Sequence, residues 1–167
     1  DGSGAPRVAR SRDGPAGLVE RARGARLGGD FREAVRLSWQ ALGLDPNRAE
    51  AWFELSQAYL ADNEGASAET ASLEAMRLEP FNETYVLHHF DVIRESRSPA
   101  IVMREMQRAK RRFPDSPEIT YELARAFEEV ANDPRNAVYL YNQFLDLAPN
   151  HPLASRVRGE LRRLGAP

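Results

Sequence analysis

The sequence contains no cysteine among its 167 residues. Disulfide bonds, thiolate metal ligands and cysteine nucleophiles are therefore excluded. No apolar run approaches the roughly 18 residues that span a bilayer, and no signal-peptide pattern is present. Lysine is nearly missing as well: Lys110 is the only one, whereas arginine and alanine are abundant. This bias is typical of a genome rich in G and C, and it favours a bacterial source.

An excess of charge of one sign is also lacking. The 23 Lys and Arg residues nearly balance the 25 Asp and Glu residues, which leaves a net charge of −2. No global field therefore favours nucleic acid or an anionic membrane. The sequence begins at Asp1 rather than methionine, so we expect a longer parent chain with room upstream for a signal or an anchor. Cytoplasmic and cell-envelope locations both stay open.

What the sequence does contain is a repeat of 34 residues. Residues 1–14 are dense in Gly, Pro, Ser and Arg and predict a flexible leader. Beyond them, prolines and alanines recur in phase, with a single gap of 35 at the end of the proline series. The prolines are Pro46, Pro80, Pro114 and Pro149, and the alanines are Ala34 with Ala68, and Ala41 with Ala75 and Ala109.

Each unit reads as two helices. In the second unit, Trp52, Leu55 and Tyr59 follow helical spacing, and a polar break precedes a second helix that ends before Pro80. The predicted hairpins span about 15–48, 49–82, 83–116 and 117–151. Residues 152–167 form a predicted capping helix and tail, because the apolar face of an amphipathic helix covers the end of a stack.

These residues resemble the tetratricopeptide repeat. The match is clearest in the second unit, at Trp52, Leu55, Tyr59, Ala68, Ala75 and Pro80. The third unit is the most divergent, since Phe90 and Val102 replace small residues. The resemblance covers about Pro15 to Asn150 and implies an all-α, right-handed superhelical solenoid of antiparallel helix hairpins. Small residues permit close helix packing, which larger ones would prevent.

The resemblance also implies where a partner would bind, because the first helix of each hairpin lines the concave side in this family. Reading across units gives three rows of residues spaced by 34. The apolar row is Val19, Phe53, Leu87 and Tyr121; the mostly acidic row is Glu20, Glu54, His88 and Glu122; the third is Arg23, Gln57, Asp91 and Arg125. We expect these rows to hold a protein or peptide segment with apolar and some basic side chains. The alternative is that parts of the rows pack between helices or solvate the surface.

One family use is disfavoured. Co-chaperone members grip a C-terminal carboxylate with lysine, asparagine and arginine at set places in the groove. Here those places hold Val19, Arg23, Glu54, Thr84 and His88. Only Arg23 fits such a clamp, and Glu54 would repel a carboxylate. The sequence therefore argues against a chaperone-tail adaptor.

Catalytic and metal-binding motifs are not found, so we expect no enzyme activity, no cofactor and no metal. His88, from the only histidine pair, His88-His89, and Asp91 three residues later offer two metal ligands on one helix, but a site needs at least one more. No Gly-rich phosphate loop or nucleophile elbow occurs. His88, within an acidic row, is also a candidate for a ligand affinity that changes between pH 5 and 8.

The second helix of the third unit carries a basic patch. It consists of Arg104, Arg108, Lys110, Arg111 and Arg112. Basic residues complement the dipole at a helix C-terminus, and the alternative is a surface for an acidic partner or nucleic acid. We expect no nucleic acid to bind.

The function that follows is a protein-interaction scaffold or adaptor. The alternative is the scaffolding portion of a larger bacterial enzyme, or of an envelope or secretion assembly protein. Self-association through an imperfectly covered end of the solenoid is a third possibility, and no part of this fragment is expected to insert in a membrane.

Overall fold

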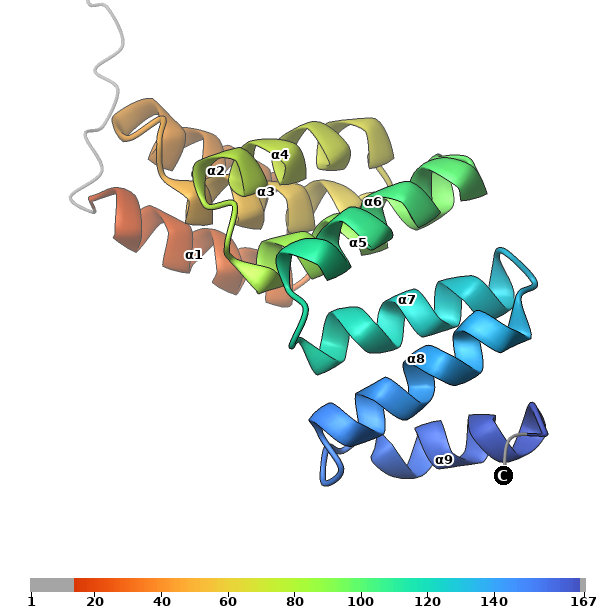
Figure 1. Ribbon diagram of the computed structural model, residues 1–167. Helices are drawn as coiled ribbons and strands as arrows, with labels where there is room; N and C mark the ends of the chain where they lie inside the picture. Colours follow the sequence, from red (N-terminus) through yellow and green to blue (C-terminus); the bar gives the residue numbers. More distant parts are fainter. Residues whose placement is uncertain (1–13, 166–167) are drawn as a thin grey trace, which may run out of the picture. The chain divides into compact units, whose positions relative to one another are not determined.

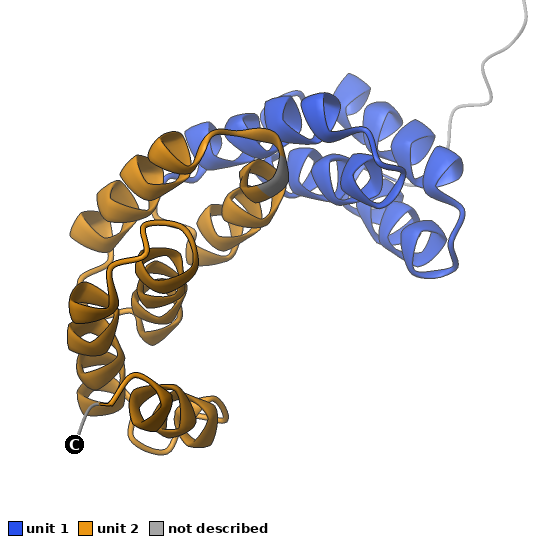
Figure 2. Cartoon of the chain, turned by 90° about the vertical axis from the view of Figure 1, so that its right-hand side faces the viewer, with its two compact units in different colours: residues 1–80 blue, residues 81–167 orange. Residues whose placement is uncertain are grey.

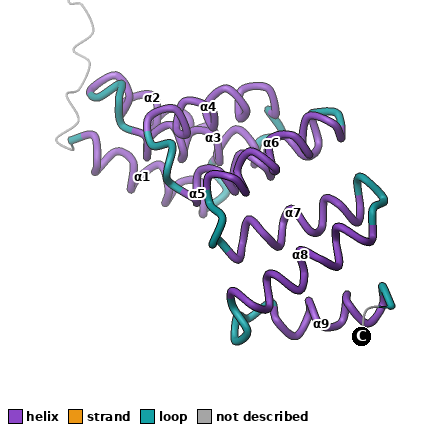
Figure 3. Tube along the Cα trace, viewed as in Figure 1, coloured by secondary structure: helices purple, strands orange, loops and turns teal. Residues whose placement is uncertain are grey.

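The computed structural model describes residues 14–165, and each regular element in that range is an α-helix (Figures 1 and 3). The helices are α1 (Pro15–Leu27), α2 (Phe31–Leu44), α3 (Ala49–Ala61), α4 (Gly65–Leu78), α5 (Glu83–Ser96), α6 (Pro99–Arg112), α7 (Pro117–Glu129), α8 (Pro134–Leu147) and α9 (Ala154–Arg163). The all-α prediction is therefore confirmed over these residues. The predicted leader lies outside them, apart from Gly14.

The chain divides into two compact units, which are coloured separately in Figure 2. Unit 1 is Asp1–Pro80 and unit 2 is Phe81–Pro167. Unit 1 holds the hairpins α1–α2 and α3–α4, and unit 2 holds α5–α6, α7–α8 and the last helix, α9.

The hairpin turns of unit 1 need a left-handed backbone residue. Gly29 has a φ of +84° between α1 and α2, and Asn63 has a φ of +61° between α3 and α4. Glycine and asparagine tolerate this conformation better than other residues. Asp30 then caps α2, because its side chain accepts a hydrogen bond from the Glu33 amide. Each turn thus reverses the chain within three residues.

The core of unit 1 combines large apolar side chains with alanines. Leu18, Leu37 and Leu55 are buried in one cluster. The repeated alanines lie between the paired helices and are also buried; they are Ala34, Ala41, Ala68 and Ala75. Because these side chains are small, the helices of each hairpin in unit 1 pack along most of their length.

The first hairpin of unit 2 departs from this pattern. Phe90 on α5 and Val102 on α6 are both buried, and α5 and α6 approach each other at fewer points than the helices of the other hairpins. Larger side chains between two helices hold their axes apart. The turn differs too, because Arg97 has an extended backbone rather than a left-handed one. The third repeat, which the sequence marks as the most divergent, therefore forms a wider hairpin than the other repeats.

The rest of unit 2 packs around aromatic residues. Tyr141 and Phe144 on α8 are buried against α7. The turn before α8 is one residue longer than the hairpin turns of unit 1, which fits the gap of 35 in the proline series, and Asn132 in this turn has a φ of +50°. Helix α9 packs against α8 through Val157, which is buried. In Figure 1 it lies beside α8 at the C-terminal end of the chain.

Candidate binding surface

The predicted site residues lie on the first helix of each hairpin. In unit 1, α1 carries Val19 and Arg23, and α3 carries Phe53, Glu54 and Gln57. In unit 2, α5 carries Leu87, His88 and Asp91, and α7 carries Tyr121, Glu122 and Arg125.

Two of the unit 1 residues are not on the surface. Val19 has no exposed area and belongs to the core cluster, and Glu54 is 2% exposed. Phe53, Gln57 and Arg23 are partly exposed. Of the two residues that unit 1 contributes to the apolar row, only Phe53 is accessible at the surface. Val19 packs between helices, which is the alternative stated for parts of these rows.

Arg23 and Glu54 form the centre of a charged cluster between α1 and α3. Nε of Arg23 donates to Glu54 Oε1 at 2.9 Å, and its other nitrogens reach Glu20 Oε1 at 2.9 Å and Glu50 Oε1 at 3.3 Å. Nε of Arg26 donates to Glu54 Oε2 at 3.1 Å. The hydrogen bond that Arg23 donates to Glu54 is the main cause that raises the pKa of Arg23. The buried carboxylate is thus neutralised by two arginines, as a buried charge requires.

Unit 2 contains an open hollow between α5, α7 and the residue before α9. It encloses about 420 Å³, part of which is open to solvent, and most of its wall is apolar. We call it the unit 2 hollow, and its lining residues are Leu87, Asp91, Glu118, Tyr121, Glu122 and Leu153. Four of these six, namely Leu87, Asp91, Tyr121 and Glu122, are predicted site residues.

The floor of the hollow is rigid. The ring of Tyr121 is nearly buried, and its centroid lies 6.2 Å from that of Tyr141 and 5.8 Å from that of Phe144. Aromatic contacts of this kind hold the ring in one orientation. Burial is also the main cause that raises the pKa of the Tyr121 hydroxyl. Tyr121 therefore lines the hollow while its ring packs against the aromatic core of α8.

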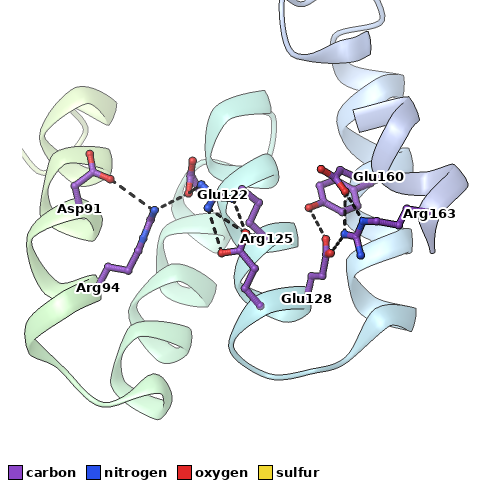
Figure 4. A network of polar contacts seen from close by, with 9 residues as sticks. Asp91, Arg94, Glu122, Arg125, Glu128, Glu160 and Arg163 are labelled. Carbon is purple, nitrogen blue, oxygen red and sulfur yellow. Dashed lines mark hydrogen bonds and ion pairs between the residues drawn. The ribbon is translucent and has the colours of Figure 1, made fainter. Parts of the chain in front are cut away.

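One side of the rim is a chain of ion pairs (Figure 4). Arg94 donates to Glu122 Oε2 at 2.7 Å and lies 3.6 Å from Asp91 Oδ1, and Arg125 lies 3.6 Å from Glu122. Arg125 also bonds Glu129 at 3.1 Å. Partial burial raises the pKa of the Asp91 carboxyl, and the two arginines oppose that shift. Asp91 is thus an exposed carboxylate beside Arg94 at the edge of the hollow.

The other side of the rim is held by His151 in the turn before α9. Its Nδ1 accepts a hydrogen bond from the Leu153 amide at 3.1 Å, and its Nε2 lies 3.1 Å from Glu118 Oε1. Because Nδ1 accepts, the neutral ring carries its proton on Nε2 and donates it to Glu118. The turn residue thereby fixes Glu118 and Leu153, the two lining residues that the sequence analysis did not assign to the site.

The histidine pair does not form a metal site within residues 14–165. His88 is partly exposed and His89 is buried. Among the described residues, no group of three His, Cys, Asp or Glu side chains could hold a metal ion. None of the helices described is both long enough and apolar enough to cross a membrane.

Solved structures of other proteins share this arrangement of helices. A thermophilic tetratricopeptide repeat protein from Thermus thermophilus, TTC0263, superposes with a TM-score of 0.70 at 19% identity, over 93% of this chain and 82% of that one. The chain has the tetratricopeptide-repeat fold. The fold that the family resemblance implied is therefore confirmed.

Two other neighbours differ in how much of their length is matched. MamA from Desulfovibrio magneticus RS-1 has a TM-score of 0.67 at 13% identity, with 90% of this chain and 94% of that chain covered. A mutant O-GlcNAc transferase from Thermobaculum terrenum has a TM-score of 0.65 at 24% identity, with 81% of this chain covered. The chain spans about a quarter of that transferase, 26% of its length. No protein-family profile matches the sequence, and no curated protein matches it either.

Proposed function

We propose that this tetratricopeptide-repeat chain is a protein-interaction module that binds a segment of a partner protein over α5 and α7. The observation that carries the proposal is the unit 2 hollow, because it gathers four predicted site residues around one open, mostly apolar depression. Ligand sites are typically concave and apolar, with a few polar groups that fix orientation. A side chain of the partner would be anchored there.

The lining favours binding over catalysis. Its six residues are two leucines, a tyrosine and three carboxylates, with neither serine nor lysine among them. Glu122 is engaged by arginines and Glu118 by His151. Such paired carboxylates give charge selectivity at the rim, while the leucines supply apolar contact area. We infer an adaptor without catalytic activity of its own.

A selection from a displayed library of random peptides tests this function. We expect the immobilised chain to enrich peptides that then bind in isothermal titration calorimetry. Leu87→Gln removes an apolar wall of the hollow, and we expect it to weaken that binding about fivefold, which corresponds to about 1 kcal/mol of lost contact. The matched control is Leu147→Gln, because Leu147 is an exposed leucine on α8 outside the hollow.

Circular dichroism of both variants shows whether the helices are intact. Failure to enrich any peptide would refute the proposed function. Equal binding by the wild type and Leu87→Gln would refute the role of the hollow. If Leu147→Gln weakens binding as much as Leu87→Gln does, the role of the hollow is also refuted, since Leu147 is not among the lining residues.

A second candidate function is favoured by one comparison. The match to the transferase covers only about a quarter of that protein, 26% of its length. This chain would then act as the scaffolding portion of a larger enzyme or envelope protein, positioning a separate part. The full-length reading frame is the test: a catalytic or membrane-bound region on the same chain supports this candidate, and its absence refutes it.

A further inference from the structure

The two units contain equivalent positions that can be compared side by side. Because the repeat is 34 residues long, α1 and α3 of unit 1 correspond to α5 and α7 of unit 2 at an offset of 68. The equivalent pairs are Val19 with Leu87, Arg23 with Asp91, Glu50 with Glu118, Phe53 with Tyr121, and Glu54 with Glu122. The second members of all five pairs line the unit 2 hollow.

In unit 1 an arginine of the chain itself occupies this place. Arg23 donates to Glu54 at 2.9 Å and reaches Glu50 at 3.3 Å, so one guanidinium joins two carboxylates that are one helical turn apart on α3. Helices α1 and α3 pack closely around it. The fork of five N–H donors in arginine suits such an arrangement, which a lysine cannot reproduce.

In unit 2 both carboxylates are retained but that arginine is replaced by Asp91. Glu122 keeps one partner in common with unit 1, because Arg94 bonds Glu122 as Arg26 bonds Glu54. Glu118 meets a histidine instead of an arginine. Helices α5 and α7 approach less closely than α1 and α3, and the hollow lies between them.

We propose that the unit 2 hollow receives the side chain of an arginine from the partner, in the place that Arg23 fills within unit 1. Its aliphatic stem would pack against Leu87, Tyr121 and Leu153, and its guanidinium would bond Glu118 and the rim carboxylates. Replacing Arg23 by Asp91 removes one positive charge and adds a negative one, and Arg125 at the place of Gln57 returns only one positive charge, so these positions keep an added attraction for a cation. This inference rests on the proposed function and names the chemistry of the partner.

The peptide selection supplies the first test. We expect arginine to be enriched at one fixed position in the peptides that the wild-type chain selects. Replacing that arginine by citrulline keeps the shape and removes the charge, and we expect about tenfold weaker binding in calorimetry. Replacement by lysine should also weaken binding, since a single ammonium cannot reproduce the fork.

Three variants of the chain supply the second test. Asp91→Arg places the chain's own arginine in the hollow, as in unit 1, and we expect it to abolish binding of the arginine peptide. Glu118→Gln removes one guanidinium acceptor and should weaken binding about threefold. Asp146→Asn is the matched control, because Asp146 is an exposed carboxylate on α8 outside the lining, and it should leave binding unchanged.

The possible failures can be told apart. Selection of no peptide refutes the proposed function and this inference together. Peptides whose affinity depends on Leu87 but which lack a common arginine refute the inference alone. Unchanged arginine-peptide binding by a folded Asp91→Arg variant also refutes it. If that variant does not fold, Glu118→Gln is used instead, because it keeps the size of the side chain. Unchanged binding of the arginine peptide by Glu118→Gln would then refute the inference.

Discussion

The buried carboxylate of Glu54 gives a test of how unit 1 is held together. Glu54→Gln keeps the size of the side chain and removes its charge while Arg23 and Arg26 remain. The carboxylate accepts bonds of 2.9 Å and 3.1 Å from these two guanidinium groups and is 2% exposed. A hydrogen bond to a charged group contributes about 1.5–3 kcal/mol, and loss of one member of a fully buried pair costs about 3–5 kcal/mol.

The expected cost lies below that upper range because the arginines are not fully buried. The side chains of Arg23 and Arg26 are 36% and 21% exposed, so water partly solvates them after the change. Arg23 also keeps its bonds to Glu20 and Glu50. We therefore expect Glu54→Gln to lower the free energy of unfolding of unit 1 by about 2–3 kcal/mol at pH 7.

Urea unfolding followed by tryptophan fluorescence measures this cost. The only two tryptophans, Trp39 and Trp52, are in unit 1, so the signal reports that unit. Glu20→Gln is the control, because Glu20 bonds the same Arg23 but its side chain is 63% exposed. We expect the control to cost at most about 0.5 kcal/mol. Equal effects of the two changes would refute the argument that burial sets the magnitude.

Three further predictions concern packing, titration and capping. Ala68→Val places a larger side chain in the close α3–α4 hairpin and should cost about 1–3 kcal/mol by tryptophan-monitored urea unfolding; no loss would contradict the role of the small residue. Asp91→Asn should raise the urea midpoint slightly at pH 7 and not at pH 3, measured by circular dichroism. Burial raises the pKa of Asp91 in the folded state, so its ionisation destabilises the fold as the pH rises above the unfolded value. The effect is small because the side chain is 62% exposed, and a gain at pH 3 would contradict it. Ser116→Ala removes the side-chain acceptor for the Ile119 amide at the start of α7. We expect it to lower the free energy of unfolding of unit 2 by about 1 kcal/mol. Thermal unfolding followed by circular dichroism measures this loss, and an unchanged melting temperature would contradict it.

The fold was predictable because its determinants repeat along the chain. Alanines at a spacing of 34 set how closely helices can pack, and prolines at a similar spacing mark where each hairpin ends. The same logic marked the third unit as the most divergent, since Phe90 and Val102 are bulky at places where the other repeats are small, and the structure shows that its hairpin is the wide one. These are local properties of residue size and backbone geometry, which spacing in the sequence reports directly.

The candidate site was only partly predictable because spacing gives the face of a helix and not the distance to its neighbour. Val19 and Leu87 share one phase of the repeat, yet Val19 is buried and Leu87 lines the hollow. The difference arises from the closer approach of α1 to α3 than of α5 to α7. The distance between two helices depends on the tertiary packing of the whole unit, so it cannot be read from the residue at any single repeat position.

The two lining residues that were not predicted are Glu118, in the first turn of α7, and Leu153, just before α9. Glu118 marks the start of α7 in the sequence, and Leu153 belongs to the apolar face of the predicted capping segment. Both residues are held at the hollow by His151. This histidine contacts Glu118, which lies 33 residues earlier in the chain, and accepts a hydrogen bond from the amide of Leu153. Residues at equivalent repeat positions are 34 residues apart, and His151 lies in the turn that follows the last repeat. Its contact with Glu118 on α7 therefore has no counterpart in the repeat pattern.

If the unit 2 hollow binds a partner as proposed, the substitution at one repeat position separates a structural site in unit 1 from a binding site in unit 2. At position 23 the side chain completes the carboxylate pair of its own unit, and the cluster is internally satisfied. At the equivalent position 91 the charge is reversed, and the carboxylates of α7 border an open hollow. Arg94, Arg125 and His151 already contact carboxylates there, and the proposed partner arginine would join this network in the place that Arg23 fills in unit 1. The proposed preference for a basic side chain therefore rests on these local charges and not on the net charge, since the chain as a whole is nearly neutral.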